Sequence, residues 1–286
     1  MTAADAPGGP GSSGHVLGAG VVDDASLTAA GLALAAESAR FAGLGWMPGT
    51  AGNLSVTLAR DPLRLAVTAS GLDKGELTAS DIVLIDGDGE WVPDAPGVPG
   101  GSGGPGGSGE PGGSGVPDGD GVATGRLGDA VDDHPASGGF TERLGLARRP
   151  SAEAGLHARI AAVTGAGAVI HVHALAAVRA AHAWPEGVVL HDLEMLKGIG
   201  HSAHGERVVL PVVQNHQDMR VLGDDFERVY LRPTAADPAA GTSAVAEVPA
   251  LLVASHGIYA WGADLRQARW HLELTEALLQ IALATR

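Results

Sequence analysis

The sequence contains no cysteine, and this absence excludes several classes of protein. A chain without thiols has no disulfide framework, no cysteine-based zinc ribbon and no iron–sulfur centre. Basic residues are also scarce, since Lys and Arg number 18 against 33 Asp and Glu, which gives a net charge of −15. Nucleic-acid binding needs a basic face to replace condensed counterions, so this balance argues against a nucleic-acid partner.

Long apolar runs are absent as well. No stretch approaches the ~18 uninterrupted apolar residues of a spanning helix, which argues against a membrane protein. The opening segment, MTAADAPGGPGSSG, lacks the basic and apolar regions of a secretory signal. We therefore expect a cytoplasmic protein. With 12 histidines and no cysteine, any metal site is expected to use imidazole and carboxylate ligands.

Glycine and proline are concentrated in one segment. Residues 97–121 hold 13 glycines and 4 prolines. Such a segment buries too little apolar surface to offset its backbone entropy. We expect a flexible insertion over about 94–147, which is either a tolerated surface loop or a partner-binding segment, and a disordered tail over 1–23. Residues 24–286 are then expected to form one domain that the insertion interrupts.

The rest of the chain alternates helical and strand patterns. Helices are expected over about 26–42, 151–164, 174–183, 217–229 and 264–285, and strands over 53–58, 65–68, 82–85, 168–173, 188–193, 208–213 and 250–255. Ser26 is expected to cap the first helix. Several strands follow each other through short turns. This favours an α/β layered domain with an antiparallel or mixed sheet over a doubly wound parallel one.

The sharpest local signal is His171-Val172-His173, at the end of an apolar strand. Residues i and i+2 of a strand point to the same face, so both imidazoles project together and offer two ligands to an ion such as Zn²⁺. The alternative is a pair of hydrogen-bonded structural histidines. His256 follows another apolar run and is a candidate third ligand, although spacing alone does not pair it with His171.

Two turns rich in glycine and small polar residues are candidate anion sites. The first is GTAGNLS (49–55), and the second is TASG (68–71), which Asp73 and Lys74 follow. Consecutive backbone N–H groups in such turns can cradle a phosphate. The helix start at Ser151 is a third candidate, because free N–H groups and the helix dipole favour anions. The alternative for each is an ordinary turn or helix start.

Two glutamates are candidates for acid–base chemistry. Glu153 lies in the first turn of the helix that starts at Ser151, where the helix dipole alone would account for it. Glu194 follows the strand over 188–193 and lies among apolar residues. Burial would raise the pKa of Glu194 toward a value useful for proton transfer, and the alternative is a charge on a surface loop.

Seven segments together resemble one known family, the class II (zinc) sugar-phosphate aldolases and adducins. They are GWMPGTAGNLSV (45–56), TASGLDKGELTASDIVLID (68–86), RPSAEAGLHARI (149–160), AVIHVHALAAV (168–178), LEMLKGI (193–199), LPVVQNH (210–216) and HGIYAWG (256–262). The motifs SGLDKG and EMLKGIG are closer to the dehydratases of this family than to its aldolases. The resemblance covers both folded parts and leaves out the tail and the insertion.

This resemblance implies a fold and a set of functional residues. The fold is a three-layer α-β-α domain around a central, mostly antiparallel sheet, in a homotetramer with active sites near subunit interfaces. One Zn²⁺ per subunit would be bound by His171, His173 and His256. Glu194 would be the acid–base residue, and Glu153 a ligand or base. The implied phosphate contacts are Asn53, Ser55, Ser70, Gly71 and Ser151, while Lys74 lies in a matching motif without an assigned role.

The implied activity is dehydration of a 2-ketose 1-phosphate. In that reaction a carboxylate removes the C3 proton, and zinc stabilises the resulting enediolate. One alternative is a retro-aldol reaction on a related sugar phosphate. Another is a non-catalytic scaffold like the adducin head, which has lost its metal ligands. The presence of all three histidines argues against the scaffold.

Overall fold

The protein is described here by a computed structural model that covers residues 22–92, 148–231 and 248–286. The predicted insertion over 94–147 and most of the predicted tail lie outside the described residues. Val22 and Asp23, which the prediction placed in the tail, belong to the fold, because Val22 is buried and Asp23 caps the first helix. The parts before and after the insertion belong to one compact unit.

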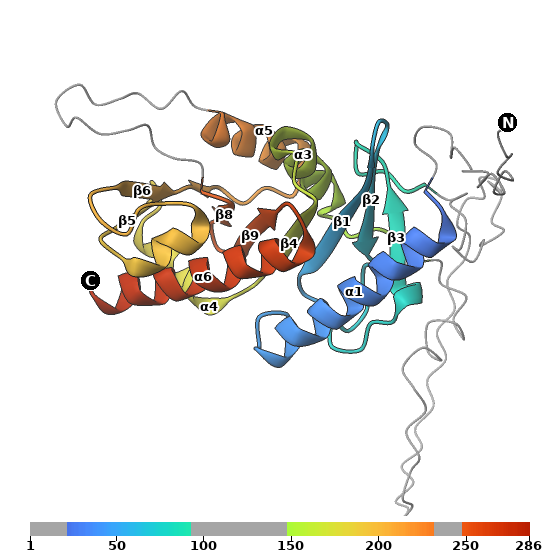
Figure 1. The fold of residues 1–286 in the computed structure, drawn as a ribbon, viewed down its shortest axis with the longest axis horizontal. Helices are drawn as coiled ribbons and strands as arrows, with labels where there is room; N and C mark the ends of the chain where they lie inside the picture. Colours follow the sequence, from blue (N-terminus) through green and yellow to red (C-terminus); the bar gives the residue numbers. More distant parts are fainter. Residues whose placement is uncertain (1–21, 93–147, 232–247) are drawn as a thin grey trace, which may run out of the picture. The chain divides into compact units, whose positions relative to one another are not determined.

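A seven-stranded sheet forms the centre of this unit, with the strand order β3-β2-β1-β4-β9-β8-β7 (Figure 1). Every neighbouring pair is antiparallel except β7 and β8, which are parallel. The expected mostly antiparallel sheet is therefore confirmed. The strands are β1 (Asn53–Arg60), β2 (Leu63–Thr68), β3 (Ile82–Ile85), β4 (Ala168–Val172), β7 (Val212–Val213), β8 (Ala250–Val253) and β9 (Gly257–Gly262).

Helices cover both faces of this sheet, which completes the expected α-β-α layering. The side chains of β4 alternate between the two layers, as a strand requires. Ile170 packs in the same core cluster as Leu34 and Leu272, whereas Val169 packs with Leu156 and Phe226. The first layer contains α1 (Asp24–Gly43), α4 (Leu175–Ala183) and α6 (Leu265–Ala284), and the second contains α3 (Ala154–Thr164) and α5 (Met219–Tyr230).

A smaller two-stranded sheet and two short 3₁₀ helices complete the described elements. The strands of the smaller sheet are antiparallel and are β5 (Val188–His191) and β6 (Arg207–Leu210). The 3₁₀ helices are η1 (Ala79–Asp81) and η2 (Glu194–Ile199). The single strand expected over 208–213 is wrong, because Pro211 separates β6 from β7. Proline has no N–H for a sheet ladder, so the chain changes sheets there.

The ends of several elements also differ from prediction. Asp23 and not Ser26 caps α1, since the Asp23 carboxylate accepts a hydrogen bond from the Ser26 N–H at 2.6 Å. Strand β9 was not expected at all. It lies so close to β4 that a Cβ on Gly257 would be 2.3 Å from the Val172 carbonyl oxygen. Only glycine permits this approach of the two strands.

No helix within the described ranges combines the length and the apolar character that crossing a bilayer requires.

Candidate metal centre

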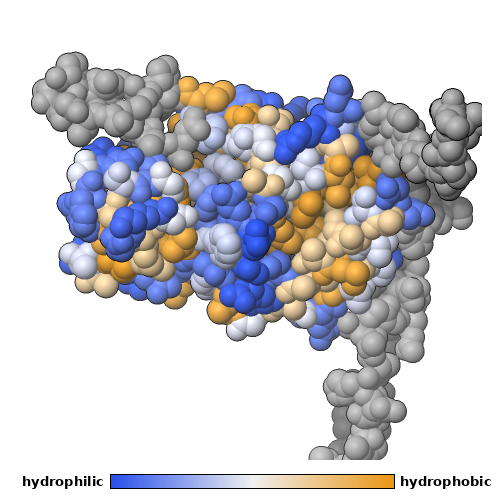
Figure 2. Space-filling view, in the orientation of Figure 1, coloured by the Kyte–Doolittle hydropathy of each residue, from blue (hydrophilic) through white to orange (hydrophobic). Residues whose placement is uncertain are grey.

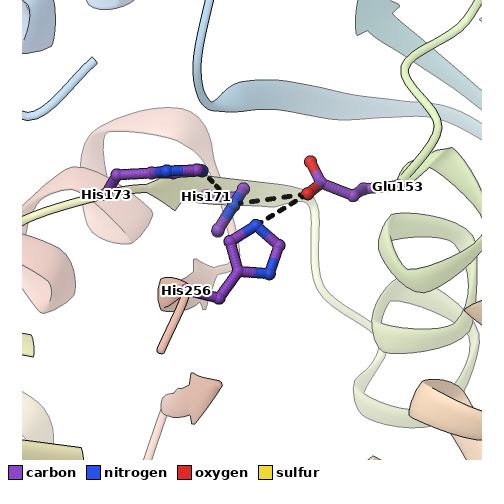
Figure 3. A group of neighbouring side chains, drawn as sticks. All are labelled: Glu153, His171, His173 and His256. Carbon is purple, nitrogen blue, oxygen red and sulfur yellow. Dashed lines mark hydrogen bonds and ion pairs between the residues drawn. The ribbon is translucent and has the colours of Figure 1, made fainter. Parts of the chain in front are cut away.

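The structure brings His171, His173, His256 and Glu153 together at one end of the central sheet (Figure 3). One potential ligand atom from each residue lies within 4.8 Å of the other three. No other group of three or more His, Asp or Glu side chains in the described part of the chain meets this criterion.

Strand pairing explains how residues distant in sequence meet here. His171 pairs with Asn53 of β1 on one side and with Tyr259 of β9 on the other. The turn between β8 and β9 therefore lies beside the end of β4, and it carries His256. The chain reverses at Ser255, whose φ of 56° lies in the left-handed region. Long-range register thus provides the third histidine.

The four side chains converge on one point. The Nε2 atoms of His171 and His173 are 3.0 Å apart. The Glu153 Oε1 atom lies 2.9 Å from His256 Nε2 and 3.7 Å from His171 Nε2. Each pair of imidazole rings has a centroid separation of 4.8 Å. Nitrogen and carboxylate oxygen atoms from four residues therefore surround a common volume.

The orientation of His171 suits a metal ligand. Its Nδ1 atom lies 3.1 Å from the Ile258 carbonyl oxygen. A carbonyl only accepts hydrogen bonds, so Nδ1 carries the proton and Nε2 offers its lone pair to the centre. The His171 ring also stacks on the buried Tyr259 ring at 4.1 Å and 14°. Both contacts fix the ring that faces the other ligands.

The charges at the centre also fit a divalent cation. Burial lowers the pKa of His171 to about 3, and burial together with the nearby His256 lowers the pKa of His173. Burial alone would raise the pKa of Glu153, but the hydrogen bonds with His256 and Asn53 act against it, and that pKa is lowered. Neutral imidazoles and an ionised carboxylate are the donors that zinc-type ions prefer.

A cavity of about 180 Å³ adjoins the centre. Its lining includes the predicted phosphate contacts Asn53, Ser70 and Ser151, together with Glu153 and His173 of the centre. Gly71 follows Ser70 at a φ of 76°, which glycine tolerates, but it does not line the cavity. The two predicted turns and the start of α3 therefore meet beside the histidines.

Two predicted site residues lie elsewhere. Ser55 is fully buried, and its hydroxyl is hydrogen-bonded to His157 at 2.8 Å, so it is not placed to contact a phosphate. The Glu194 side chain is 71% exposed and pairs with Lys197 at 2.5 Å. Of the two alternatives left open for Glu194, the structure has the surface charge, and the hydrogen bond from Lys197 lowers its pKa. No contact joins Glu194 to the centre among the described residues.

Two residues beside the centre were not assigned a role from the sequence. Lys74 lines the cavity and is only 1% exposed. Its ammonium donates to the carbonyl oxygens of Thr50 at 3.0 Å and Leu72 at 2.9 Å. His157 is fully buried beneath Asn53 and Ser55. Its four-residue spacing from Glu153 on one helix face was the available signal.

The chain belongs to the class II aldolase and adducin family. Residues 33–283 match the family described as Class II Aldolase and Adducin N-terminal domain. This match confirms the family indicated by the seven sequence segments. The family is typically metal-dependent, and the His/Glu centre could bind a metal.

Among curated relatives, the methylthioribulose-1-phosphate dehydratase of Acidiphilium cryptum is 32% identical over 249 residues, which cover 86% of each chain. The dehydratase of the same name from Sulfurihydrogenibium sp. is 29% identical over 239 residues, which cover 83% of this chain and 81% of the relative. A Nocardia farcinica protein, named as a probable bifunctional methylthioribose-1-phosphate isomerase/methylthioribulose-1-phosphate dehydratase, is 33% identical over 93% of this chain. This chain covers 37% of that longer protein.

Solved structures with the same fold include YgbL from Escherichia coli, with a TM-score of 0.57 and 16% identity over 91% of each chain. The L-fuculose-1-phosphate aldolase of Thermus thermophilus has a TM-score of 0.52 and 19% identity, over 92% of this chain and 96% of that one. At these identities the comparison concerns the fold alone. It confirms the predicted class II aldolase-like α/β architecture.

Proposed function

We propose that this chain is a zinc-dependent hydro-lyase that converts 5-methylthioribulose 1-phosphate to 5-methylthio-2,3-dioxopentyl 1-phosphate in methionine salvage. The observation that carries this proposal is the centre of three histidines and an ionised glutamate beside a cavity lined by polar donors and a buried lysine. The names of the curated relatives support the particular substrate.

His171, His173 and His256 would hold one Zn²⁺ per subunit. When bound there, a divalent ion would supply positive charge that makes the proton beside a substrate ketone more acidic. Neutral imidazole ligands leave the charge of the ion undiminished. Glu153 Oε1 lies in the same cluster and would be a further ligand or a base.

The cavity would bind the phosphate group. Asn53, Ser70 and Ser151 offer side-chain donors around it. Lys74 adds a buried ammonium that forms no salt bridge among the described residues. Burial lowers its pKa, and the charges of Asp73 and Glu153 oppose that shift. A phosphate would balance the charge of this ammonium, and hydrogen bonds to an ionised group are the strong ones. Anchoring the phosphate would hold the reacting carbons against the histidine centre.

Dehydration requires a carboxylate that removes a proton from C3 of the substrate. The C3–H bond breaks and its proton passes to the carboxylate, the C4–O bond breaks, and the departing hydroxyl takes a proton and leaves as water. The enol that remains tautomerises to the 2,3-diketone. Glu194 is our proposed acid–base residue. Within one subunit its exposed carboxylate does not contact the centre, so it would act from a neighbouring subunit.

A homotetramer remains our proposal for the assembly. Large apolar side chains are exposed on the subunit, among them Leu32 at 62%, Leu44 at 49% and Leu175 at 69%. Figure 2 shows hydrophobic surface gathered toward the part of the visible face where α1 lies. Contact between subunits would cover such surface. Light scattering would report the number of subunits, and the cytoplasmic location stays a prediction.

The decisive experiment supplies zinc-loaded protein with methylthioribulose 1-phosphate and identifies the product by mass. Loss of one water and formation of a diketone are expected. An aldehyde fragment would instead indicate retro-aldol cleavage. Turnover of neither kind, together with a failure to bind metal stoichiometrically, would favour a scaffold of the adducin type. His216→Ala is the control for ligand variants, since His216 is partly exposed and lies outside the centre.

A further inference from the structure

A chain of buried hydrogen bonds connects β1 and α3 beneath the metal centre. The Nδ1 atom of His157 lies 2.8 Å from the Ser55 hydroxyl, and its Nε2 atom is hydrogen-bonded to Asn53 Oδ1. The Asn53 amide nitrogen donates to Ser151 Oγ at 2.8 Å and to Glu153 Oε2. The chain therefore runs from Ser55 through His157 and Asn53 to Glu153.

The direction of each hydrogen bond follows from the one next to it. An ionised Glu153 carboxylate only accepts, so Asn53 must present its NH₂ group to it. The Asn53 oxygen then faces His157 and also only accepts, so His157 carries its proton on Nε2. A neutral imidazole has one proton, which leaves His157 Nδ1 bare to accept from the Ser55 hydroxyl.

The surroundings of His157 keep the ring neutral. The side chain is fully buried, and the edge of its ring contacts Tyr259 at a centroid distance of 5.7 Å and an angle of 68°. Burial lowers the pKa of His157 to about 4. The ring therefore has one proton near neutral pH, as the hydrogen-bond directions require.

The opposite tautomer would reverse the whole arrangement. With its proton on Nδ1, His157 would turn a bare Nε2 toward Asn53. The Asn53 amide would then rotate to donate to His157, and its oxygen would face the Glu153 carboxylate. Two acceptors would be in contact in a buried site, which is unfavourable.

We infer that His157 is a positioning residue: its Nε2–H tautomer, whose bare Nδ1 accepts from Ser55, orients the Asn53 amide so that Glu153 Oε2 is held and Oε1 is aimed at the three histidines. The inference deepens the proposed function, because its kinetic consequences rest on that activity. It also gives Ser55 a role within the protein in place of the predicted phosphate contact.

The matched variants are His157→Gln and His157→Asn. The glutamine amide nitrogen can take the place of Nε2 and donate to Asn53, whereas the asparagine amide reaches only the place of Nδ1. We expect His157→Gln to keep kcat within about fivefold and His157→Asn to lose about 10–100-fold in kcat and in zinc affinity, with KM little changed. Equal losses in both folded variants, or no loss in His157→Asn, would overturn the inference.

Ser55→Ala separates the two roles of Ser55 and removes only one buried oxygen atom. If the hydroxyl holds the His157 ring through its hydrogen bond to Nδ1, kcat falls while KM for the substrate is unchanged. A raised KM with normal kcat would instead mean a phosphate contact and would contradict the inference.

Nitrogen-15 NMR of histidine-labelled, zinc-loaded protein tests the tautomer directly. The His157 signals, assigned by their loss in His157→Gln, are expected to show a protonated Nε2 and a bare Nδ1. A proton on Nδ1 near neutral pH would refute the inference. This measurement needs no substrate, so the expected tautomer in a protein without dehydratase turnover would refute the proposed function alone.

Discussion

The start of α3 and the region around η2 each have a glutamate and a lysine close together. Glu153 and Lys74 line one cavity beside α3, and Glu194 and Lys197 pair at η2. The surroundings of the two pairs are opposite. Near α3, Glu153 is held by His256 and Asn53, and Lys74 is 1% exposed and forms no salt bridge with a carboxylate of the described residues. At η2, Glu194 and Lys197 are 71% and 63% exposed and pair with each other. Lys74 and Lys197 are the only lysines in the sequence.

The difference shows what each pair can do within one subunit. Water screens the attraction between the charges of a surface ion pair, so the pair contributes little free energy. A buried charge keeps its strength but needs a partner, which the protein supplies to Glu153 and leaves for a ligand to supply to Lys74. Within one subunit, the buried binding groups therefore lie in the α3 region, and the role that we propose for Glu194 requires a second subunit.

The sharpest way to break this comparison is to neutralise each glutamate. Glu153→Gln should lose about 100-fold or more in turnover and also lose zinc affinity, because it removes a charge from the centre. Glu194→Gln should keep zinc and phosphate affinity but lose turnover. Metal analysis and steady-state kinetics measure both. Normal turnover in Glu194→Gln beside an inactive Glu153→Gln would show that the acid–base assignment is wrong.

The two lysines give a second comparison with a smaller effect. Lys74→Met keeps the length of the side chain and removes its charge. Loss of one hydrogen bond to an ionised group predicts a rise of about tenfold or more in the inhibition constant of inorganic phosphate. Lys197→Met is the matched control and should leave that constant unchanged. Equal inhibition of the wild type and Lys74→Met would remove Lys74 from the phosphate site.

Buried His157 predicts a pH effect on stability. Its pKa in the folded state is about 4, below its ordinary value of 6.5. As pH falls from 6.5 toward 4, the unfolded chain gains a proton that the folded chain does not, so the free energy of unfolding decreases. For this one group the loss between pH 7 and pH 5 is about 2 kcal/mol. Urea unfolding of metal-free protein should show a shallower pH dependence in His157→Gln, and parallel curves would contradict this cause.

The smallest expected effect is on the Glu194–Lys197 pair. Both side chains are largely exposed, so Lys197→Ala should leave the thermal midpoint of the subunit unchanged within experimental error. A clear decrease would mean that η2 is buried in the assembly, and this result would support an interface at Glu194.

Local patterns in the sequence predicted the local features of the centre. The i, i+2 spacing of His171 and His173 was sufficient to put both rings on one face of a strand. The predicted boundaries of β3 are those of the structure, because four apolar residues lie between clear turns. Strands joined by short turns predicted a layered domain with an antiparallel or mixed sheet, and the family resemblance implied the mostly antiparallel order.

The remaining features depend on contacts that one segment does not encode. His256 reaches His171 through the register of β9 against β4, and β9 itself had no predicted boundary. Glu194 follows a strand and Ser55 lies within one, yet Glu194 is exposed and Ser55 is buried. Their surroundings come from packing between distant elements, which no single segment of the sequence encodes.

Gly257 gives the close pairing of β4 and β9 a wider consequence. Even a single methyl group there would collide with the neighbouring backbone and force the two strands apart at the end where His171 and His256 face each other. The geometry of the centre thus depends on the absence of a side chain at Gly257, a position that offers no ligand. An alanine at this position would move the histidines apart and weaken the binding of an ion.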